Sequence, residues 1–336
     1  MKTILKKLID RQDLTETETF DVVTDILSGK LTEAQMGAFL ATLQAKGVTV
    51  DEICGGARAM RSAARRIQSL KPNTLDTVGT GGDGGMSFNV STTVAFVAAG
   101  AGATVAKHGN RASSGKSGSA DCLEQLGLNL KADPEIMEQA LNEIGIAFLF
   151  AQSFHQAMRF AAGVRRELGV RTLFNLLGPL TNPAGAPCQL IGVFAPDLTE
   201  TFAHVLKKLG SRRVLVVHGH DGMDEITLTG TTRCSELKDG LVKTYDIDPY
   251  EFFGDYCTNP ELEGGDAAQN AEITKNILLG KTNGPKRNIV LINAAASLLA
   301  AGLVDNLTDG IKKSVDSIDS GAAYDKLMKL IEHSKS

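Results

Sequence analysis

Apolar residues recur with a helical period through the first 70 residues of the chain. Three segments there begin with a capping box, in which a threonine is followed three positions later by Glu or Gln: Thr15 and Glu18, Thr32 and Gln35, Thr49 and Glu52. The second box precedes an apolar face at helical spacing, made of Met36, Phe39, Leu40 and Leu43. The pattern predicts three short helices. It also predicts a helix at the N-terminus, where acidic residues soon follow a short apolar run.

The pattern changes after Pro72, where short apolar runs typical of buried strands alternate with helical segments. The runs predict strands at residues 75–78, 105–106, 146–150, 189–194 and 214–218. Helical patterns lie between them, including an Ala/Val-rich helix at 92–99, and a buried Ala/Leu-rich helix is predicted at 293–303. Residues 255–265 should form a polar loop. Strands that alternate with helices predict a mainly parallel sheet.

The chain length of 336 residues exceeds the usual size of one hydrophobic core, so two domains are expected. Residues 164–184 break the α/β rhythm with Gly and Pro and are expected to pack back on the helical part. We therefore predict an α/β protein with a small α-helical domain (1–70 plus about 164–184) and a larger α/β domain (72–163 and 185–336). The larger domain should hold a mainly parallel central sheet flanked by helices.

The composition excludes several classes of protein. Hydrophobic residues make up 43% and charged residues 22%, a balance typical of globular rather than disordered chains. The net charge of -4, with both signs mixed along the chain, offers no basic field for nucleic acid or an anionic membrane. The five cysteines lie tens of residues apart and match neither a metal-binding nor a disulfide pattern. Since no apolar run approaches the length of a membrane span, we expect a cytoplasmic protein that binds neither nucleic acid nor membrane.

A glycine-rich loop at residues 79–85 follows the first predicted strand. Without Cβ atoms its backbone N–H groups can close on an anion, and phosphate is the natural guest. Asn89, Ser91 and Thr92 stand where the next helix should begin, so hydroxyls, N–H groups and the positive helix end would converge on that anion. A flexible turn with an ordinary N-cap is the alternative, because the loop matches neither the Walker pattern nor GxGxxG.

A second polar loop, residues 107–121, follows the next predicted strand. Its lysines, arginine, serines and glycines suit a polyphosphate or the group that leaves from one. Because the carboxyl ends of parallel strands meet at one edge of a sheet, both loops are expected to line the same crevice. A solvated basic loop is the alternative, and His108 alone is weak evidence, because a lone histidine is more often structural than catalytic.

Two further sets of charged residues are candidate ligands. Asp224 and Glu225 come just after the last predicted strand, and adjacent carboxylates suit Mg²⁺, which commonly accompanies phosphates. A solvated acidic pair is the alternative there. Arg165 lies among small and apolar residues, where its guanidinium could hold a substrate carboxylate with two hydrogen bonds. For Arg165, pairing with Glu167 or with solvent is the alternative.

Six motifs stand in order along the chain: GTGGD at 79–83, NVST at 89–92, KHGN at 107–110, SGSAD at 117–121, RTLFNLLGPLTNPA at 171–184 and DGMDE at 221–225. Their order and spacing closely resemble those of the anthranilate phosphoribosyltransferase family over nearly the whole chain. The resemblance implies a step of tryptophan biosynthesis, in which anthranilate and 5-phosphoribosyl 1-pyrophosphate (PRPP) give N-(5-phosphoribosyl)anthranilate and pyrophosphate. It also implies Mg²⁺ as the metal, the two-domain fold predicted above, and a homodimer formed through the helical parts.

The resemblance assigns roles position by position. Around PRPP it places Gly79, Gly82, Asp83, Ser87, Asn89, Val90, Ser91, Thr92, Lys107, His108, Gly109, Asn110, Arg111, Ala112, Ser113, Ser114, Gly115 and Ser119. For magnesium it implies Ser91, Asp224 and Glu225. For anthranilate it implies Gly79, Asn110 and Arg165, with the carboxylate on Arg165.

The chain departs from the family pattern at a few positions. Gly115 stands where a serine is common and Ser113 where an apolar residue is usual, so phosphate contacts there should rely more on the backbone. Gln152 and Gln156 replace prolines near the expected anthranilate channel, where loop stiffness and substrate tolerance should differ.

The implied chemistry needs little from any single side chain. Since the amine of anthranilate is nucleophilic while neutral, orientation of both substrates can supply much of the rate, and Mg²⁺ and Lys107 would neutralise the leaving group. No catalytic residue is therefore assigned, and His108 is at most a candidate proton acceptor. The alternatives are a pyrimidine nucleoside phosphorylase-like enzyme, disfavoured by KHGN and Asp224–Glu225, and a nucleic-acid-binding relative without activity, disfavoured by the acidic net charge and the intact substrate motifs.

Overall fold

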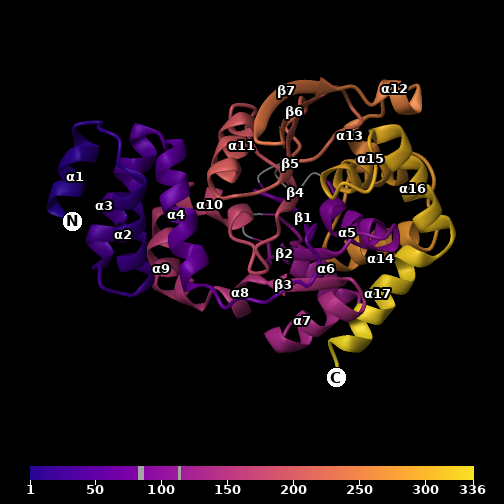
Figure 1. Ribbon diagram of the computed structural model, residues 1–336, viewed down its shortest axis with the longest axis horizontal. Helices are drawn as coiled ribbons and strands as arrows, with labels where there is room; N and C mark the ends of the chain where they lie inside the picture. Colours follow the sequence, from indigo (N-terminus) through magenta and orange to yellow (C-terminus); the bar gives the residue numbers. More distant parts are fainter. Residues whose placement is uncertain (82–86, 113–114) are drawn as a thin grey trace.

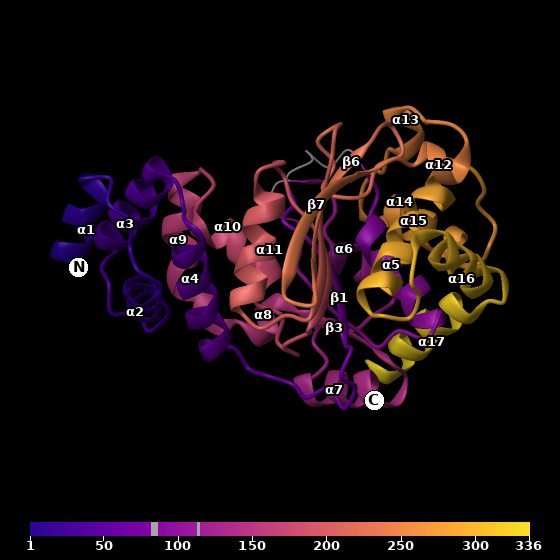
Figure 2. The ribbon, with the colours of Figure 1, turned by 45° about the horizontal axis from the view of Figure 1, so that its top comes forward.

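A computed structural model describes residues 1–81, 87–112 and 115–336 of the chain (Figure 1). Within these ranges the chain forms a bundle of helices at one end and a seven-stranded sheet with helices on both faces at the other. The view in Figure 2, turned by 45°, shows the same division, with the sheet between the bundle and a second layer of helices. The predicted fold class, a helical part plus an α/β part with a mainly parallel sheet, is confirmed.

The helical part begins with four helices, α1 (Lys2–Ile9), α2 (Glu16–Leu27), α3 (Glu33–Lys46) and α4 (Val50–Ala63). All three predicted capping boxes form, with the threonine side chain accepting the N3 backbone N–H and the N3 side chain accepting the threonine N–H. Two later helices join the bundle: α9 (Arg159–Leu168) contacts α2 and α3, and α10 (Leu173–Leu177) contacts α3 and α4. The chain thus returns to the bundle midway through the α/β part.

The sheet has the strand order β3-β2-β1-β4-β5-β6-β7 in the described chain. Its strands are β1 (Leu75–Gly79), β2 (Val105–Gly109), β3 (Ile146–Phe150), β4 (Cys188–Gly192), β5 (Arg213–Gly219), β6 (Thr232–Lys238) and β7 (Leu241–Ile247). The pairs among β1 to β5 are parallel, in register from Leu75↔Cys188 to Gly79↔Gly192 between β1 and β4. The five predicted strands are therefore present, within a few residues at their ends.

The hairpin of β6 and β7 is the one part of the sheet that the hydrophobic pattern did not predict. It extends the sheet antiparallel to β5 and turns at Asp239–Gly240, where both residues have positive φ, 50° and 74°. A two-residue Asp-Gly turn with positive φ at both positions matches the twist of a hairpin. The dipeptide was therefore a usable signal. The polar loop predicted at 255–265 also contains a short helix, α13 (Asn259–Leu262).

Helices cover both faces of the sheet. One face carries α5 (Val90–Gly100), which contacts β1, β2 and β3, and α15 (Pro285–Ala300), which contacts β4 and β5. The predicted helix at 293–303 corresponds to α15, which begins eight residues earlier than predicted. The remaining helices of this part are α6 (Ser119–Gln125), α7 (Pro134–Glu143), α8 (Ala151–Phe154), α11 (Leu198–Lys208), α12 (Tyr250–Phe253), α14 (Ala267–Leu278), α16 (Leu307–Asp319) and α17 (Ala322–His333), with 3-10 turns η1 (Gln156–Met158) and η2 (Gly178–Leu180).

The hydrophobic core has two main clusters, one on each face of the sheet. The first holds α5 and α15 against the strands, with Phe96 as its largest fully buried side chain. The second runs without interruption from the bundle to the other face of the sheet and contains both Phe39 of α3 and Phe202 of α11. Packing of α11 against α4 and β5 therefore ties the bundle to the sheet.

Candidate active site

Four parallel strands end in glycine at the same edge of the sheet: β1 at Gly79, β2 at Gly109, β4 at Gly192 and β5 at Gly219. Two of these glycines leave room for the turn that follows β5. A Cβ on Gly79 would collide with Oδ2 of Asp224, and a Cβ on Gly192 would collide with the backbone oxygen of the same residue. The glycines therefore allow the turn at 221–225, which carries Asp224 and Glu225 and is called the acidic turn below, to lie against the ends of β1 and β4.

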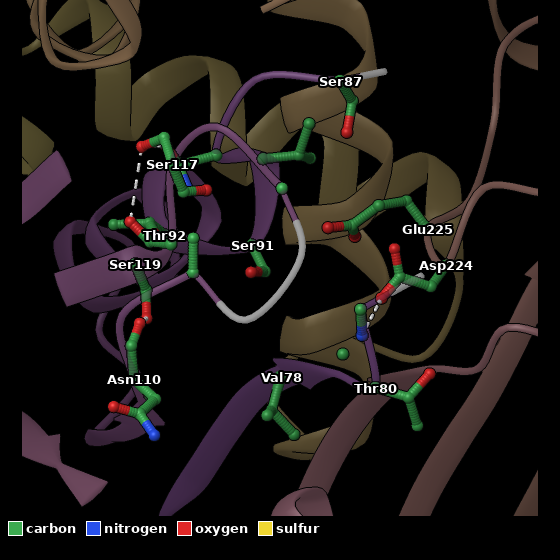
Figure 3. Close-up of a pocket in the computed structure, with 18 of the residues that line it drawn as sticks. Val78, Thr80, Ser87, Ser91, Thr92, Asn110, Ser117, Ser119, Asp224 and Glu225 are labelled. Carbon is green, nitrogen blue, oxygen red and sulfur yellow. Dashed lines mark hydrogen bonds between the residues drawn. The ribbon is translucent and has the colours of Figure 1, made fainter. Parts of the chain in front are cut away.

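A crevice of about 360 Å³ lies at this edge, lined by the loops after β1, β2, β4 and β5. Figure 3 shows Asp224 and Glu225 on one side and Asn110 and Ser119 on the other, with Ser91 between them. The first loop is attached to the acidic turn because Gly81 N donates to Asp224 Oδ2 at 2.9 Å. The two anion-binding loops predicted from the sequence thus line one crevice, as expected for the carboxyl end of a parallel sheet.

The N-terminus of α5 is open toward the crevice. Asn89 occupies the N-cap position, but its side chain makes no capping hydrogen bond. Instead Asn89 Oδ1 accepts from Ser117 Oγ at 3.0 Å and from Asn270 Nδ2 at 3.1 Å, which holds the loop after β2 and α14 against this helix end. The positive end of α5 is consequently available to an anion.

Lys107 lies under the crevice at the end of β2, only 3% exposed. Its Nζ donates to Thr77 O at 2.6 Å and to Ser91 Oγ at 3.3 Å. Burial lowers the pKa of Lys107 to about 8, while the nearby Asp76 carboxylate opposes that shift. Asp76 is itself fully buried, and burial raises its pKa to about 6 although Oδ1 accepts the His108 N–H at 3.0 Å. The Lys107 ammonium group is thus held in place beneath the two loops.

The loop after β2 is fixed by Asp121 in the first turn of α6. Asp121 Oδ2 accepts the backbone N–H groups of Ala112 and Gly118, at 2.9 and 3.0 Å, and Oδ1 accepts from Arg111 at 2.8 Å. Arg111 also donates to both carboxylate oxygens of Glu124, at 2.8 and 2.9 Å. The charge of Arg111 is therefore largely balanced by two carboxylates of α6.

The acidic turn is held from below by a buried asparagine of α15. Asn293 Oδ1 accepts the N–H of Ile226 at 2.9 Å, and Asn293 Nδ2 donates to the carbonyl of the same residue at 2.9 Å. Asp221, earlier in the turn, accepts hydrogen bonds from the hydroxyls of Thr227 and Thr229, both at 2.6 Å. Asp224 and Glu225 are consequently positioned by residues on each side.

A second cavity of about 570 Å³ adjoins the crevice and faces the helical part. Arg165 of α9 lines it, and its guanidinium lies 5.5 Å from the centre of the Phe174 ring. Burial lowers the pKa of Arg165, and among the described residues no ion pair joins it to Glu167 within 4 Å. The pairing that was the alternative interpretation of Arg165 does not occur, and the cation faces a cavity.

Two histidines form the floor of the second cavity. His108 and His155 are 4% and 7% exposed, with ring centres 5.1 Å apart. Burial lowers the pKa of His108 to about 3 and that of His155 to about 4, so both rings are neutral at physiological pH. His108 bonds the Gly178 backbone, and its Nε2 has no hydrogen-bond partner among the described residues. A neutral imidazole with so low a pKa is a poor general base but can accept a hydrogen bond.

The two cavities share a wall. The residues that line both are Val78, Gly79, Thr80, His108, Gly109, Asn110 and Asn175. Gly79 and Asn110, which the family resemblance links to both substrates, belong to this wall. A group held in the anion crevice and a group held beside Arg165 would therefore meet across these residues.

The structure brings most of the predicted site residues together. The crevice is lined by Gly79, Ser87, Asn89, Val90, Ser91, Thr92, Lys107, His108, Gly109, Asn110, Arg111, Ala112, Gly115, Ser119, Asp224 and Glu225. Arg165 lines only the second cavity. Gly82, Asp83, Ser113 and Ser114 lie outside the described residues.

Sequence reasoning missed four residues that line the crevice: Arg171, Asn175, Phe194 and Phe88. The first two stand in the motif at 171–184, to which no role was assigned, because nothing in its spacing indicates that α10 returns to the sheet edge. Phe194 lies just after β4, within the range predicted as a strand. The two glutamines that depart from the family pattern, Gln152 and Gln156, both line the second cavity.

The donor atoms of the crevice fit Mg²⁺ only in partnership with a phosphate. Among the described residues no three His, Cys, Asp or Glu side chains gather as a complete metal cage. Mg²⁺ is usually bound by one or two carboxylates together with waters and substrate phosphates. The pair Asp224 and Glu225, with the Ser91 hydroxyl beside Lys107, has the composition of such a shared site.

Comparison with known protein families identifies an N-terminal helical part followed by an α/β part. Residues 2–64 match the family described as "Glycosyl transferase family, helical bundle domain", and residues 71–324 match "Glycosyl transferase family, a/b domain". None of the helices in the described ranges combines the length and the apolar character needed to cross a bilayer.

Individual relatives cover essentially the whole chain. The chain is 56% identical over 332 residues to an anthranilate phosphoribosyltransferase of Desulfosudis oleivorans. The match covers 99% of this chain and 98% of that protein. The crystal structure of anthranilate phosphoribosyltransferase (TrpD) from Thermus thermophilus superposes with a TM-score of 0.94 at 42% identity, covering 99% of each chain. The Saccharomyces cerevisiae anthranilate phosphoribosyltransferase in complex with PRPP and Mg gives a TM-score of 0.91 at 29% identity, covering 99% of this chain and 97% of that one.

Proposed function

This chain belongs to the anthranilate phosphoribosyltransferase family, and from that premise we propose that its two adjoining cavities are the donor and acceptor sites of phosphoribosyl transfer. The enzyme transfers the phosphoribosyl group of PRPP to the amino group of anthranilate, giving N-(5-phosphoribosyl)anthranilate and pyrophosphate. The observation that carries the assignment of the two sites is the shared wall of Gly79, His108 and Asn110. It would bring an amine in one cavity next to a sugar in the other.

PRPP occupies the crevice in this proposal. Its phosphates meet the backbone of the loop after β1, the open N-terminus of α5 and the loop that Asp121 fixes after β2. The residues assigned to PRPP are those of the crevice named above other than Asp224 and Glu225, together with Gly82, Asp83, Ser113 and Ser114, which lie outside the described ranges. Lys107, held under the loops by Thr77 O, faces negative charge that develops on the leaving pyrophosphate.

Mg²⁺ is the proposed metal, held by Asp224, Glu225 and Ser91 together with oxygens of PRPP. The yeast relative is in complex with PRPP and Mg, which supports the assignment. When bound, the ion would withdraw charge from the leaving pyrophosphate. The protein contributes by holding the Asp224 carboxylate through the Gly81 N–H and the backbone after Glu225 through Asn293, so that little reorganisation is needed when the donor binds.

Anthranilate occupies the second cavity, with its carboxylate on Arg165 and its ring beside Phe174. A yeast relative is in complex with 4-fluoroanthranilate, which supports an aromatic acceptor. The low pKa of His108 argues against a role as general base and favours a role in orienting the amine through Nε2. Because a neutral aniline attacks without prior loss of a proton, orientation across the shared wall is the main contribution of the chain to that step.

We further propose the domain division 1–70 plus about 164–184, and 72–163 plus 185–336. The packing of α9 and α10 on α2, α3 and α4 supports it. A homodimer formed through the helical part is also proposed, as the family resemblance implies. The five free thiols support a reducing compartment such as the cytoplasm.

The test is a direct assay with purified protein, anthranilate, PRPP and MgCl₂, followed by the loss of anthranilate fluorescence and the release of pyrophosphate. We expect turnover that requires all three components. Ribose 5-phosphate in place of PRPP is the matched control, because it lacks the leaving group. Absence of turnover with all components present would reject the proposed function.

A further inference from the structure

Three cationic side chains line the donor crevice among the described residues: Lys107, Arg111 and Arg171. Arg111 is bound to Asp121 and Glu124, so its charge is balanced by carboxylates of the adjacent helix α6. Lys107 is buried and already donates to Thr77 O and Ser91 Oγ. Arg171 is exposed, whereas Lys107 is buried, and no carboxylate lies within 4 Å of Arg171 in the described part of the chain, whereas two lie against Arg111.

Arg171 comes from the connection between α9 and α10, which belongs to the helical side of the molecule. Its guanidinium lies over the ring of Phe194, with 3.9 Å between the guanidinium carbon and the ring centre. Stacking on an aromatic face restrains the plane of a guanidinium and leaves its N–H groups, which point outward at the edges, free to donate. The Phe194 ring therefore orients the Arg171 guanidinium, while the N–H groups of the guanidinium remain available to a ligand.

Phe194 locates Arg171 within the crevice. It follows Gly192 at the end of β4, and Gly192 is packed so closely on Asp224 that a Cβ there would strike the backbone of Asp224. Arg171 consequently lies on the side of the acidic turn and of the Gly79–Gly81 loop. It lines the donor crevice and not the second cavity, whereas Asn175, four residues later, lines both.

We propose that Arg171 binds the pyrophosphate group of the sugar donor. This inference rests on the proposed function and deepens it by assigning a donor-binding cation to the helical side of the molecule. A guanidinium edge donates two parallel N–H groups, a geometry that matches two oxygens of a phosphate. The bound pyrophosphate would then bridge the α/β loops and the α9–α10 connection.

The first test measures binding without catalysis. Isothermal titration calorimetry would compare magnesium pyrophosphate and ribose 5-phosphate as probes with the native chain, with Arg171→Ala and with Arg166→Ala. Arg166 is the matched control because it is an exposed arginine of the neighbouring helix that lines neither cavity. We expect Arg171→Ala to weaken pyrophosphate about tenfold and ribose 5-phosphate less than about twofold, with Arg166→Ala unchanged for both. Unchanged pyrophosphate affinity in Arg171→Ala, or equal weakening of both probes, would overturn the proposal.

The second test uses kinetics to separate the two substrates. Arg171→Ala should raise the KM for PRPP about tenfold and change the KM for anthranilate less than about twofold. Arg171→Lys should restore part of the loss, since it keeps the charge but not the planar fork. A rise in the KM for anthranilate alone would place Arg171 on the acceptor and reject the assignment. If the native chain shows no turnover, the proposed function fails, while the calorimetry still decides the role of Arg171 in binding pyrophosphate.

Discussion

The crevice that we propose for the donor (the donor crevice) and the second cavity, which we propose for the acceptor (the acceptor cavity), share a wall but are built by different means. The crevice is formed by loops at the ends of neighbouring strands, with glycines and backbone N–H groups close to the expected phosphates. The acceptor cavity is formed by single side chains from distant segments, such as Met60 of α4, Arg165 of α9 and Phe174 of α10. A site made of backbone should fail when an atom is added, whereas a site made of side chains should weaken when atoms are removed.

The largest effect on kinetics is expected from removing the two carboxylates proposed to hold Mg²⁺ in the donor crevice. Asp224→Ala with Glu225→Ala should lower kcat/KM for PRPP about 1000-fold, near 4 kcal/mol, because no other carboxylates among the described residues are placed to share the metal with the phosphates. The fluorescence assay at saturating Mg²⁺ measures the loss. Asp305→Ala, an exposed loop carboxylate, is the control and should be indistinguishable from the native chain. Retention of a tenth of the activity by the double variant would contradict the metal assignment.

Adding one methyl group to the donor side should come next. Gly192→Ala places a Cβ against the backbone of Asp224 and should lower kcat/KM for PRPP about 100-fold, roughly 2.7 kcal/mol, as the acidic turn shifts. Gly163→Ala on α9, where a Cβ meets nothing within 4 Å, is the matched control. Circular dichroism and the Tm of both variants would separate a displaced turn from unfolding. Equal kinetics for the two variants would mean that close approach to Asp224 is not required.

On the acceptor side, removing a side chain should affect one substrate only. Arg165→Ala should raise the KM for anthranilate about 20-fold, roughly 1.8 kcal/mol for a lost charge-assisted hydrogen bond, and should leave the KM for PRPP within about twofold. Arg166→Ala on the same helix should change neither constant. Steady-state kinetics with each substrate varied in turn checks this. A parallel rise in both KM values would show that the two cavities do not act separately.

The smallest effect concerns stability rather than kinetics. Burial holds the pKa of His155 at about 4, below the value near 6.5 expected in the unfolded chain, so acid favours the unfolded state. The contribution of His155 to stability is complete above pH 6.5 and is lost as the pH falls toward 4. Between pH 7.5 and 5.5 the native chain should lose about 1.4 kcal/mol more than His155→Asn in urea denaturation. His204→Asn, an exposed histidine on α11, should behave as the native chain.

The same contrast explains what could be predicted from the sequence. The donor loops are contiguous, follow short apolar strands and consist of residue types that bind anions, so local chemistry and strand order suffice to place them together. The helical caps were equally local, and all three form. The hairpin of β6 and β7 was missed although Asp239–Gly240 marks its turn, because a search for buried apolar runs passes over a half-exposed edge strand.

Most residues that line the acceptor cavity could not be predicted from the sequence, and the reason is physical. Met60 and Phe174 are ordinary core residues by type, and only the return of α9 and α10 to the bundle brings them beside the ends of β1 and β2. Arg165 was a candidate from its apolar surroundings and was assigned to anthranilate through the family resemblance, but its lack of a carboxylate partner follows from burial and packing, which no spacing reveals. Arg171 and Phe194 were missed for the same reason, since their stack joins segments more than twenty residues apart.

The hydrogen bonds between Asn293 and Ile226 also bear on when, during synthesis of the chain, the donor site should form. The two residues are 67 positions apart, so the acidic turn leaves the ribosome long before the helix that anchors it. At a synthesis rate of about 5–20 residues per second, Asn293 is made roughly 3–13 s after Ile226. The bundle helices α1 to α4 have been made by then, and the parallel strands β1 to β5 with them. The newly made chain should therefore acquire its capacity to bind the donor only late in translation, after most of its architecture exists.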